Sequence, residues 1–163
     1  MKKIVCIAVM ALLGFGSLSA QENRFNLGVN LGLPTGDVSD FYSFALGVEA
    51  NYLFEVSEKF QVGPSISYVN YFGKEISGFT AENASFLPLA GSGRFNASEE
   101  FVIGADIGYA IGISPEGNDG GFYYRPMLGY NISEKMQITA SYSGVSVDGG
   151  TFSHFGVGIM FGL

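Results

Sequence analysis

Three charged residues occupy equivalent positions in three different segments of the chain. Glu49, Asp106 and Arg125 each lie eight residues from the serine of a short Ser-Glu motif that occurs three times. If those segments are strands joined by equivalent turns, the three side chains lie at one height, and Arg94 lies on the same face nearer the turns. Opposite charges held in an interior are expected to pair, because an unpaired buried charge is costly. The four residues therefore predict a charge network that either fills an interior structurally or gates a narrow pore.

Catalytic and metal chemistry have few candidate residues. His154 is the only histidine, and a catalytic histidine needs a nucleophile and an orienting acid close by. Ser153 is its neighbour, but consecutive side chains of a strand point to opposite faces, and no Gly-x-Ser-x-Gly elbow occurs. A zinc site needs more His or Cys than the chain contains. We therefore predict no catalytic, cofactor or metal site and no enzymatic activity, with His154 as a lumen or loop residue.

The segments that carry these residues have the two-residue period of β-strands. In Phe101–Ile113 the odd positions are all apolar or aromatic, whereas Gly104, Gly108 and Gly112 recur on the other face. A helix would lose about 1 kcal/mol at each of these glycines. The same alternation predicts seven further strands: Phe25–Leu33, Phe44–Phe54, Phe60–Tyr68, Phe86–Phe95, Phe122–Ile132, Met136–Tyr142 and Phe155–Leu163. The alternation is weakest in Phe86–Phe95.

A short internal repeat indicates how the strands are joined. Three near-identical segments each connect two alternating strands, namely Phe54–Phe60, Phe95–Phe101 and Tyr130–Met136. We interpret them as equivalent tight turns at one end of a sheet. The remaining connections are rich in Gly, Asp and Asn and vary in length: Pro34–Phe41, Gly73–Asn83, Ser114–Gly121 and Ser146–Thr151. Three turns and four loops predict eight antiparallel strands with both termini at the turn end.

The composition of the two strand faces decides which face points outward. One face carries bulky aliphatic and aromatic residues, and the other carries Gly, Ser, Asn and Thr, in a chain with only 14% charged residues. A soluble barrel has an apolar interior and a charged exterior, so this pattern favours an apolar exterior in lipid. The backbone groups of strands in hydrocarbon are satisfied only when the sheet closes into a barrel. The prediction is an all-β, eight-stranded, antiparallel up-and-down transmembrane β-barrel.

Aromatic residues near strand ends are expected in interfacial girdles: Tyr42, Tyr52, Tyr68, Tyr71, Phe72, Tyr124 and Tyr130.

The first twenty residues have the features of a cleaved signal peptide. Lys2 and Lys3 precede an apolar stretch that is too short to span a bilayer, and Leu18, Ser19 and Ala20 form an expected cleavage site that ends in a small residue. We therefore expect residues 1–20 to be a signal peptide and residues 21–163 to form the barrel domain. The only cysteine, Cys6, lies in the predicted signal. The net charge of −7 argues against nucleic-acid binding.

Together, the signal, the alternating strands, the short Ser-Glu turns and the C-terminal strand Phe155–Leu163 resemble the small OmpA/OmpX-type outer-membrane β-barrels of Gram-negative bacteria. The resemblance implies an outer-membrane location, contacts with the lipid bilayer and lipopolysaccharide, and recognition of the C-terminal strand by the barrel-assembly machinery. We expect a monomer with a packed polar lumen and a structural or surface-interaction role. A narrow pore for small solutes or ions is the alternative.

Acidic loop residues are either solvated or bind divalent cations that bridge lipopolysaccharide phosphates: Asp37, Asp40, Glu116, Asp119 and Asp148.

Overall fold

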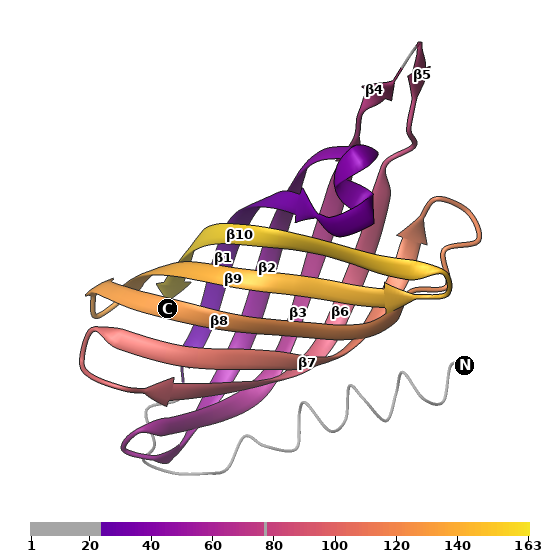
Figure 1. The fold of residues 1–163 in the computed structure, drawn as a ribbon. Helices are drawn as coiled ribbons and strands as arrows, with labels where there is room; N and C mark the ends of the chain where they lie inside the picture. Colours follow the sequence, from indigo (N-terminus) through magenta and orange to yellow (C-terminus); the bar gives the residue numbers. More distant parts are fainter. Residues whose placement is uncertain (1–23, 77) are drawn as a thin grey trace, which may run out of the picture.

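A computed structural model describes residues 24–76 and 78–163 of the chain as one closed β-barrel (Figure 1). The expected signal peptide at residues 1–20 lies outside the described residues, as does the start of the barrel domain at residue 21. The eight barrel strands are β1 (Arg24–Thr35), β2 (Tyr42–Ser57), β3 (Phe60–Gly73), β6 (Ala84–Asn96), β7 (Phe101–Ser114), β8 (Gly121–Ser133), β9 (Met136–Val147) and β10 (Gly150–Gly162). No described helix is long and apolar enough to cross a membrane.

Each strand pairs with its neighbours in the chain, and β1 pairs with β10 to close the barrel. All pairs are antiparallel, from Leu27 opposite Ala50 to Asp106 opposite Arg125. Every segment with two-residue alternation is a strand, so the prediction of an all-β, eight-stranded antiparallel barrel is confirmed. Figure 1 shows the three short turns and the C-terminus at one end, which we call the turn end, and the other connections at the loop end.

The loop end differs from the sequence prediction in three places. Strands β9 and β10 continue beyond the predicted limits, so the expected loop Ser146–Thr151 shrinks to a tight hairpin at Asp148 and Gly149. Gly149 has φ +93°, a conformation that side-chain-bearing residues rarely adopt. The β1–β2 loop contains a 3₁₀ helix, η1 (Gly36–Asp40), and the β3–β6 loop contains a small ribbon of β4 (Glu75–Ile76) and β5 (Phe79–Thr80) that projects from the barrel (Figure 1).

The outer surface is apolar along the full length of the strands. Ile107 at the centre of β7 is 58% exposed, and Leu128 on β8 is 60% exposed. Asn51, Ser92 and Thr139 are buried on the inner face. Such a surface is stable in lipid, where an apolar exterior costs nothing, and unstable in water.

The interior is not polar throughout, contrary to the expectation of a polar lumen. Near the loop end, Val69, Tyr71, Phe86 and Val145 point inward and are buried. Tyr71 was predicted to lie in an interfacial girdle, and that prediction is wrong. On β3 the odd-numbered residues from Gln61 onward face inward, and β3 extends past Tyr68, so Tyr71 follows the same parity into the lumen.

An arginine on the outer face distinguishes a barrel in lipid from one in water. We expect Ile107→Arg to destabilise the barrel by about 2–4 kcal/mol, because position 107 lies midway along β7 and so near the bilayer midplane. Ile113→Arg, on the same face near the loop end, should cost only about 0–1 kcal/mol. Urea unfolding of the two variants in lipid vesicles measures the difference. Equal effects at both positions would contradict burial of this face in hydrocarbon.

Candidate functional site

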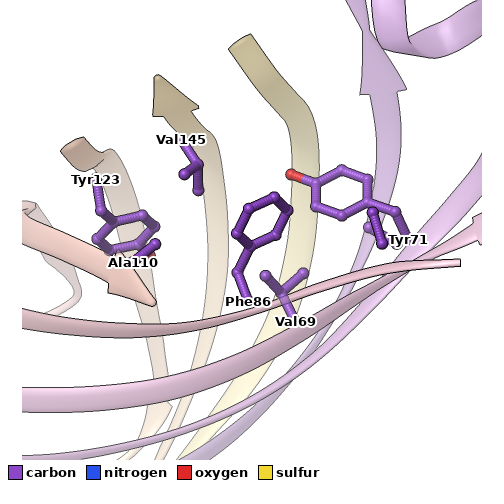
Figure 2. Close-up of a cluster of buried hydrophobic side chains, with 8 residues drawn as sticks. Val69, Tyr71, Phe86, Ala110, Tyr123 and Val145 are labelled. Atoms are coloured by element: carbon purple, nitrogen blue, oxygen red, sulfur yellow. The ribbon is translucent and has the colours of Figure 1, made fainter. Parts of the chain in front are cut away.

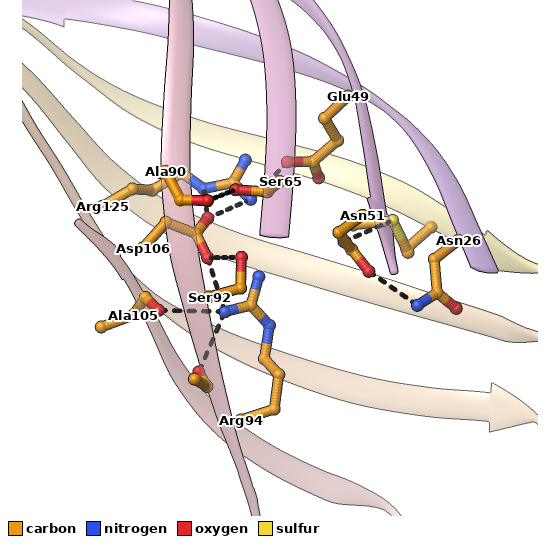
Figure 3. Close-up of polar contacts among 12 residues, drawn as sticks. Asn26, Glu49, Asn51, Ser65, Ala90, Ser92, Arg94, Ala105, Asp106 and Arg125 are labelled. Atoms are coloured by element: carbon orange, nitrogen blue, oxygen red, sulfur yellow. Dashed lines mark hydrogen bonds and ion pairs between the residues drawn. The ribbon is translucent and has the colours of Figure 1, made fainter. Parts of the chain in front are cut away.

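The four charged residues singled out from the sequence meet at mid-height in the lumen. Arg125 on β8 lies directly opposite Asp106 on β7, Arg94 projects from β6, and Glu49 reaches across from β2. Figure 3 shows the four side chains converging on one region of the interior. We call Glu49, Arg94, Asp106 and Arg125 the ion cluster.

Asp106 is the centre of the ion cluster. Its Oδ2 accepts from Nε of Arg125 at 2.8 Å and pairs with Nη2 of the same residue at 2.7 Å. Its Oδ1 accepts from Nη1 of Arg94 at 2.7 Å and from Oγ of Ser92 at 2.6 Å. Arg125 Nη2 also pairs with Glu49 Oε2. Two cations and two anions make the cluster neutral, and the Asp106 side chain is only 1% exposed.

Glycines on neighbouring strands leave room for these long side chains. A Cβ atom at Gly104, the cross-strand neighbour of Arg94, would lie 2.6 Å from Cδ of that arginine. A Cβ atom at Gly28 would lie 3.0 Å from Cγ of Glu49. Gly28 and Gly104 therefore leave the space that the side chains of Glu49 and Arg94 occupy. Ser92 was not singled out from the sequence, although it shares the inward parity of Arg94 on β6.

A second layer closes the lumen above the ion cluster. This loop-end cluster, part of which is shown in Figure 2, consists of the buried residues Ala45, Val69, Tyr71, Ala84, Phe86, Ala110, Tyr123 and Val145. Phe152 packs against it, with its ring centroid 5.0 Å from that of Phe86 and 5.5 Å from that of Tyr71. This layer was not predicted from the sequence, because the composition of each strand face was averaged over the whole length of the strand.

His154 lies in the lumen beside Tyr71 of the loop-end cluster. It is a buried lumen residue, and its Nδ1 lies 2.8 Å from the hydroxyl of Tyr71. Ser153 makes its contacts elsewhere, with Thr35. Within residues 24–76 and 78–163, no three His, Cys, Asp or Glu side chains are grouped so that they could hold a metal ion. The arrangement can pair charges and fill space.

Below the ion cluster the lumen is open. A cavity of about 890 Å³, which we call the vestibule, extends from Arg94 to the turn end. Side chains of the turns line its mouth, including Glu58, Glu99 and Lys135, and Asn51 lines it deeper in the lumen. The lumen therefore has three levels: an open vestibule, a neutral ion cluster and an apolar seal.

The acidic residues proposed for cation binding are spread over the loop end. Asp37 and Asp40 lie in η1, Glu116 and Asp119 lie between β7 and β8, and Asp148 lies in the β9–β10 hairpin. They belong to three different connections, and the described structure brings no three of them together as a metal site.

Comparison with known proteins agrees with this architecture. A family model described as "Outer membrane protein beta-barrel domain" matches residues 6–162. No curated protein matches the sequence. Among solved structures, the Yersinia pestis protein Ail is similar with a TM-score of 0.60 and 16% identity, over 86% of this chain and 97% of Ail. The N-terminal barrel of Pseudomonas aeruginosa OprF gives 0.56 and 12%, over 88% of this chain and all of that barrel. At such identities the likeness shows a shared fold.

Removal of Arg125 should reveal how much the ion cluster stabilises the barrel. We expect Arg125→Ala to lower the free energy of unfolding by about 3 kcal/mol, because Glu49 is left buried with its carboxylate unpaired. Lys59→Ala, at an exposed turn, should change it by less than about 0.5 kcal/mol. Urea titration in lipid vesicles gives both values.

The double variant Glu49→Ala/Arg125→Ala supplies the internal control for that measurement. Its loss should be smaller than the sum of the two single losses, because deletion of both partners leaves no orphaned charge at Glu49. An Arg125→Ala protein as stable as Lys59→Ala would show that the ion cluster contributes nothing to the fold.

Proposed function

Because the chain belongs to the outer membrane protein beta-barrel domain family, we propose that it is an integral barrel with a sealed lumen, in a structural or surface-interaction role without enzymatic chemistry. The protein is located in the outer membrane of a Gram-negative cell, as its family indicates. The single observation that carries the proposal is the pair of closures in series, the ion cluster and the loop-end cluster. A solute that enters from the turn end meets both.

The composition of the two closures supports a permanent seal. The ion cluster is neutral and all four of its side chains are buried, so a passing ion would have to break close pairs in a site with little water. The loop-end cluster is mainly apolar and aromatic, so it offers a passing ion few partners to replace its water. The interior of an eight-stranded barrel is just wide enough for side chains to fill.

A narrow pore remains the second candidate, because the vestibule already opens the turn-end part of the lumen. Only the ion cluster and the loop-end cluster separate its inner end from the opposite side. In that function Glu49, Arg94, Asp106 and Arg125 would form a gate rather than a structural filling.

The partners follow from the surfaces of the barrel. The apolar outer face contacts the lipid bilayer. The acidic loops would contact lipopolysaccharide through divalent cations that bridge Asp37, Asp119 or Asp148 to its phosphates. Strand β10, with Phe161 near its end and Leu163 directly after it, would be recognised by the barrel-assembly machinery. The sheet closes within a single chain, which supports a monomer as the proposed oligomeric state.

Planar-bilayer conductance separates the two functions. We expect the wild-type protein to be closed, and Arg125→Ala and Phe86→Ala each to stay closed, because either closure alone still blocks the lumen. The double variant Phe86→Ala/Arg125→Ala, which opens both closures, should conduct. A wild-type protein that conducts would favour the pore, and a folded double variant that stays closed would show that these two layers are not the seal.

The orientation of the barrel is tested by thiol labelling of intact cells. We expect the loop end to face the exterior and the turn end the periplasm, because outer-membrane barrels have longer loops outside and short turns inside. A cysteine at exposed position Asp119 should react with an impermeant reagent, and a cysteine at exposed position Glu58 should not. The reverse pattern would contradict this orientation, and labelling of lysed cells controls for the reactivity of both sites.

A further inference from the structure

Three polar side chains form a row across one wall of the vestibule. Glu55 on β2 is the cross-strand neighbour of Gln61 on β3, and Gln61 is the neighbour of Arg94 on β6. All three line the cavity. The row presents a carboxylate, a carboxamide and a guanidinium in order, with opposite charges at its two ends.

The guanidinium at the inner end is only partly satisfied. Arg94 is 3% exposed, and its Nη1 donates to Asp106, to the carbonyl of Gly93 and to the carbonyl of Ala105. Its Nη2 is buried and has no hydrogen-bond partner within the described chain. Figure 3 shows dashed lines from one terminal nitrogen of Arg94 and none from the other. A buried donor of this kind is rare and signals a missing acceptor.

The other end of the row is also free. In the described part of the chain, the side chains of Glu55 and Gln61 make no hydrogen bond, and Glu55 makes no ion pair. Neighbouring strands lie about 4.8 Å apart, so the backbones at Glu55 and Arg94 are separated by roughly 10 Å before their long side chains extend. The two charges are therefore within reach of one small molecule.

The charge balance selects the kind of molecule. A simple anion at Arg94 would add a negative charge beside a cluster that is already neutral and would be repelled by Glu55. A simple cation at Glu55 would leave Arg94 Nη2 without an acceptor. A molecule with both charges satisfies both ends and leaves the net charge unchanged. A sugar is a poorer match, because no aromatic residue among those lining the vestibule offers a stacking surface.

We propose that the vestibule binds a small zwitterion of the amino-acid class, with its carboxylate at Arg94, its ammonium at Glu55 and Gln61 between them. The cavity of about 890 Å³ lies within the range of ordinary small-molecule sites, about 300–1,000 Å³, and opens at the turn end. This binding site shares Arg94 with the ion cluster but lies on its turn-end side, and the proposal does not depend on the sealing role of the barrel.

The test is side-chain NMR of the full chain in lipid nanodiscs, with γ-aminobutyrate and glycine as zwitterionic probes. Titration should shift the Gln61 carboxamide and Arg94 guanidinium signals saturably. Acetate, methylammonium and glucose should bind at least about tenfold more weakly, a difference of about 1.4 kcal/mol. Equal binding of acetate or glucose would overturn the zwitterion class. Absence of saturable shifts with any probe would show that the vestibule holds only water.

Matched variants place the site within the vestibule. Glu55→Gln should weaken zwitterion binding at least about tenfold, because it removes the charge that selects the ammonium. Glu99→Gln removes an equal charge from the mouth of the same cavity and should leave affinity unchanged. If both variants have the same effect, general electrostatic attraction explains the binding and the proposed site is wrong. Arg94 is not replaced in this test, because its loss would also disturb the ion cluster.

Discussion

The rest of this structure depends on the closure of the sheet in lipid. Backbone N–H and C=O groups have no partner in hydrocarbon, so every strand must be paired on both sides, and the pairing of β1 with β10 completes the ring. Once the ring is closed and its outer face must be apolar, every polar side chain of the strands has to share one narrow lumen. Glu49, Arg94, Asp106 and Arg125 are then forced together, and mutual pairing is the least costly arrangement.

The three levels of the lumen accommodate the inward-facing side chains in different ways. At the turn end the vestibule is open, so the side chains there can be hydrated. At mid-height the ion cluster satisfies its own charges without a net charge. At the loop end the lumen contains Tyr71, Phe86 and their neighbours, which pack as a small hydrophobic core inside a membrane protein.

Strand parity in the sequence was sufficient to predict the fold and much of the site. The alternation in Phe101–Ile113 and its counterparts identified all eight strands, and a constant spacing from the turns placed Glu49, Asp106 and Arg125 at one height. The aromatic seal was not predicted, although parity was sufficient to place Tyr71 inward once β3 was extended. The residue type of Tyr71 gave the wrong prediction, because a tyrosine near a strand end is compatible both with an interfacial girdle and with a packed lumen. The contacts of Ser92 and the free Nη2 of Arg94 depend on side-chain rotamers, on which periodicity carries no information.

The glycines of the inner wall have a consequence for how such a barrel changes over evolution. Several of them face one large side chain on the neighbouring strand: Gly104 faces Arg94, Gly32 faces His154 and Gly129 faces Gln137, with Cβ positions 2.3–2.6 Å from those side chains. Neither member of such a pair can change size alone, because an added methyl group meets its partner and a shortened partner leaves a void. Substitutions inside the lumen should therefore be inherited as compensated pairs across a strand boundary. Homologues would then keep the total side-chain volume of each level of the barrel while exchanging which strand supplies it.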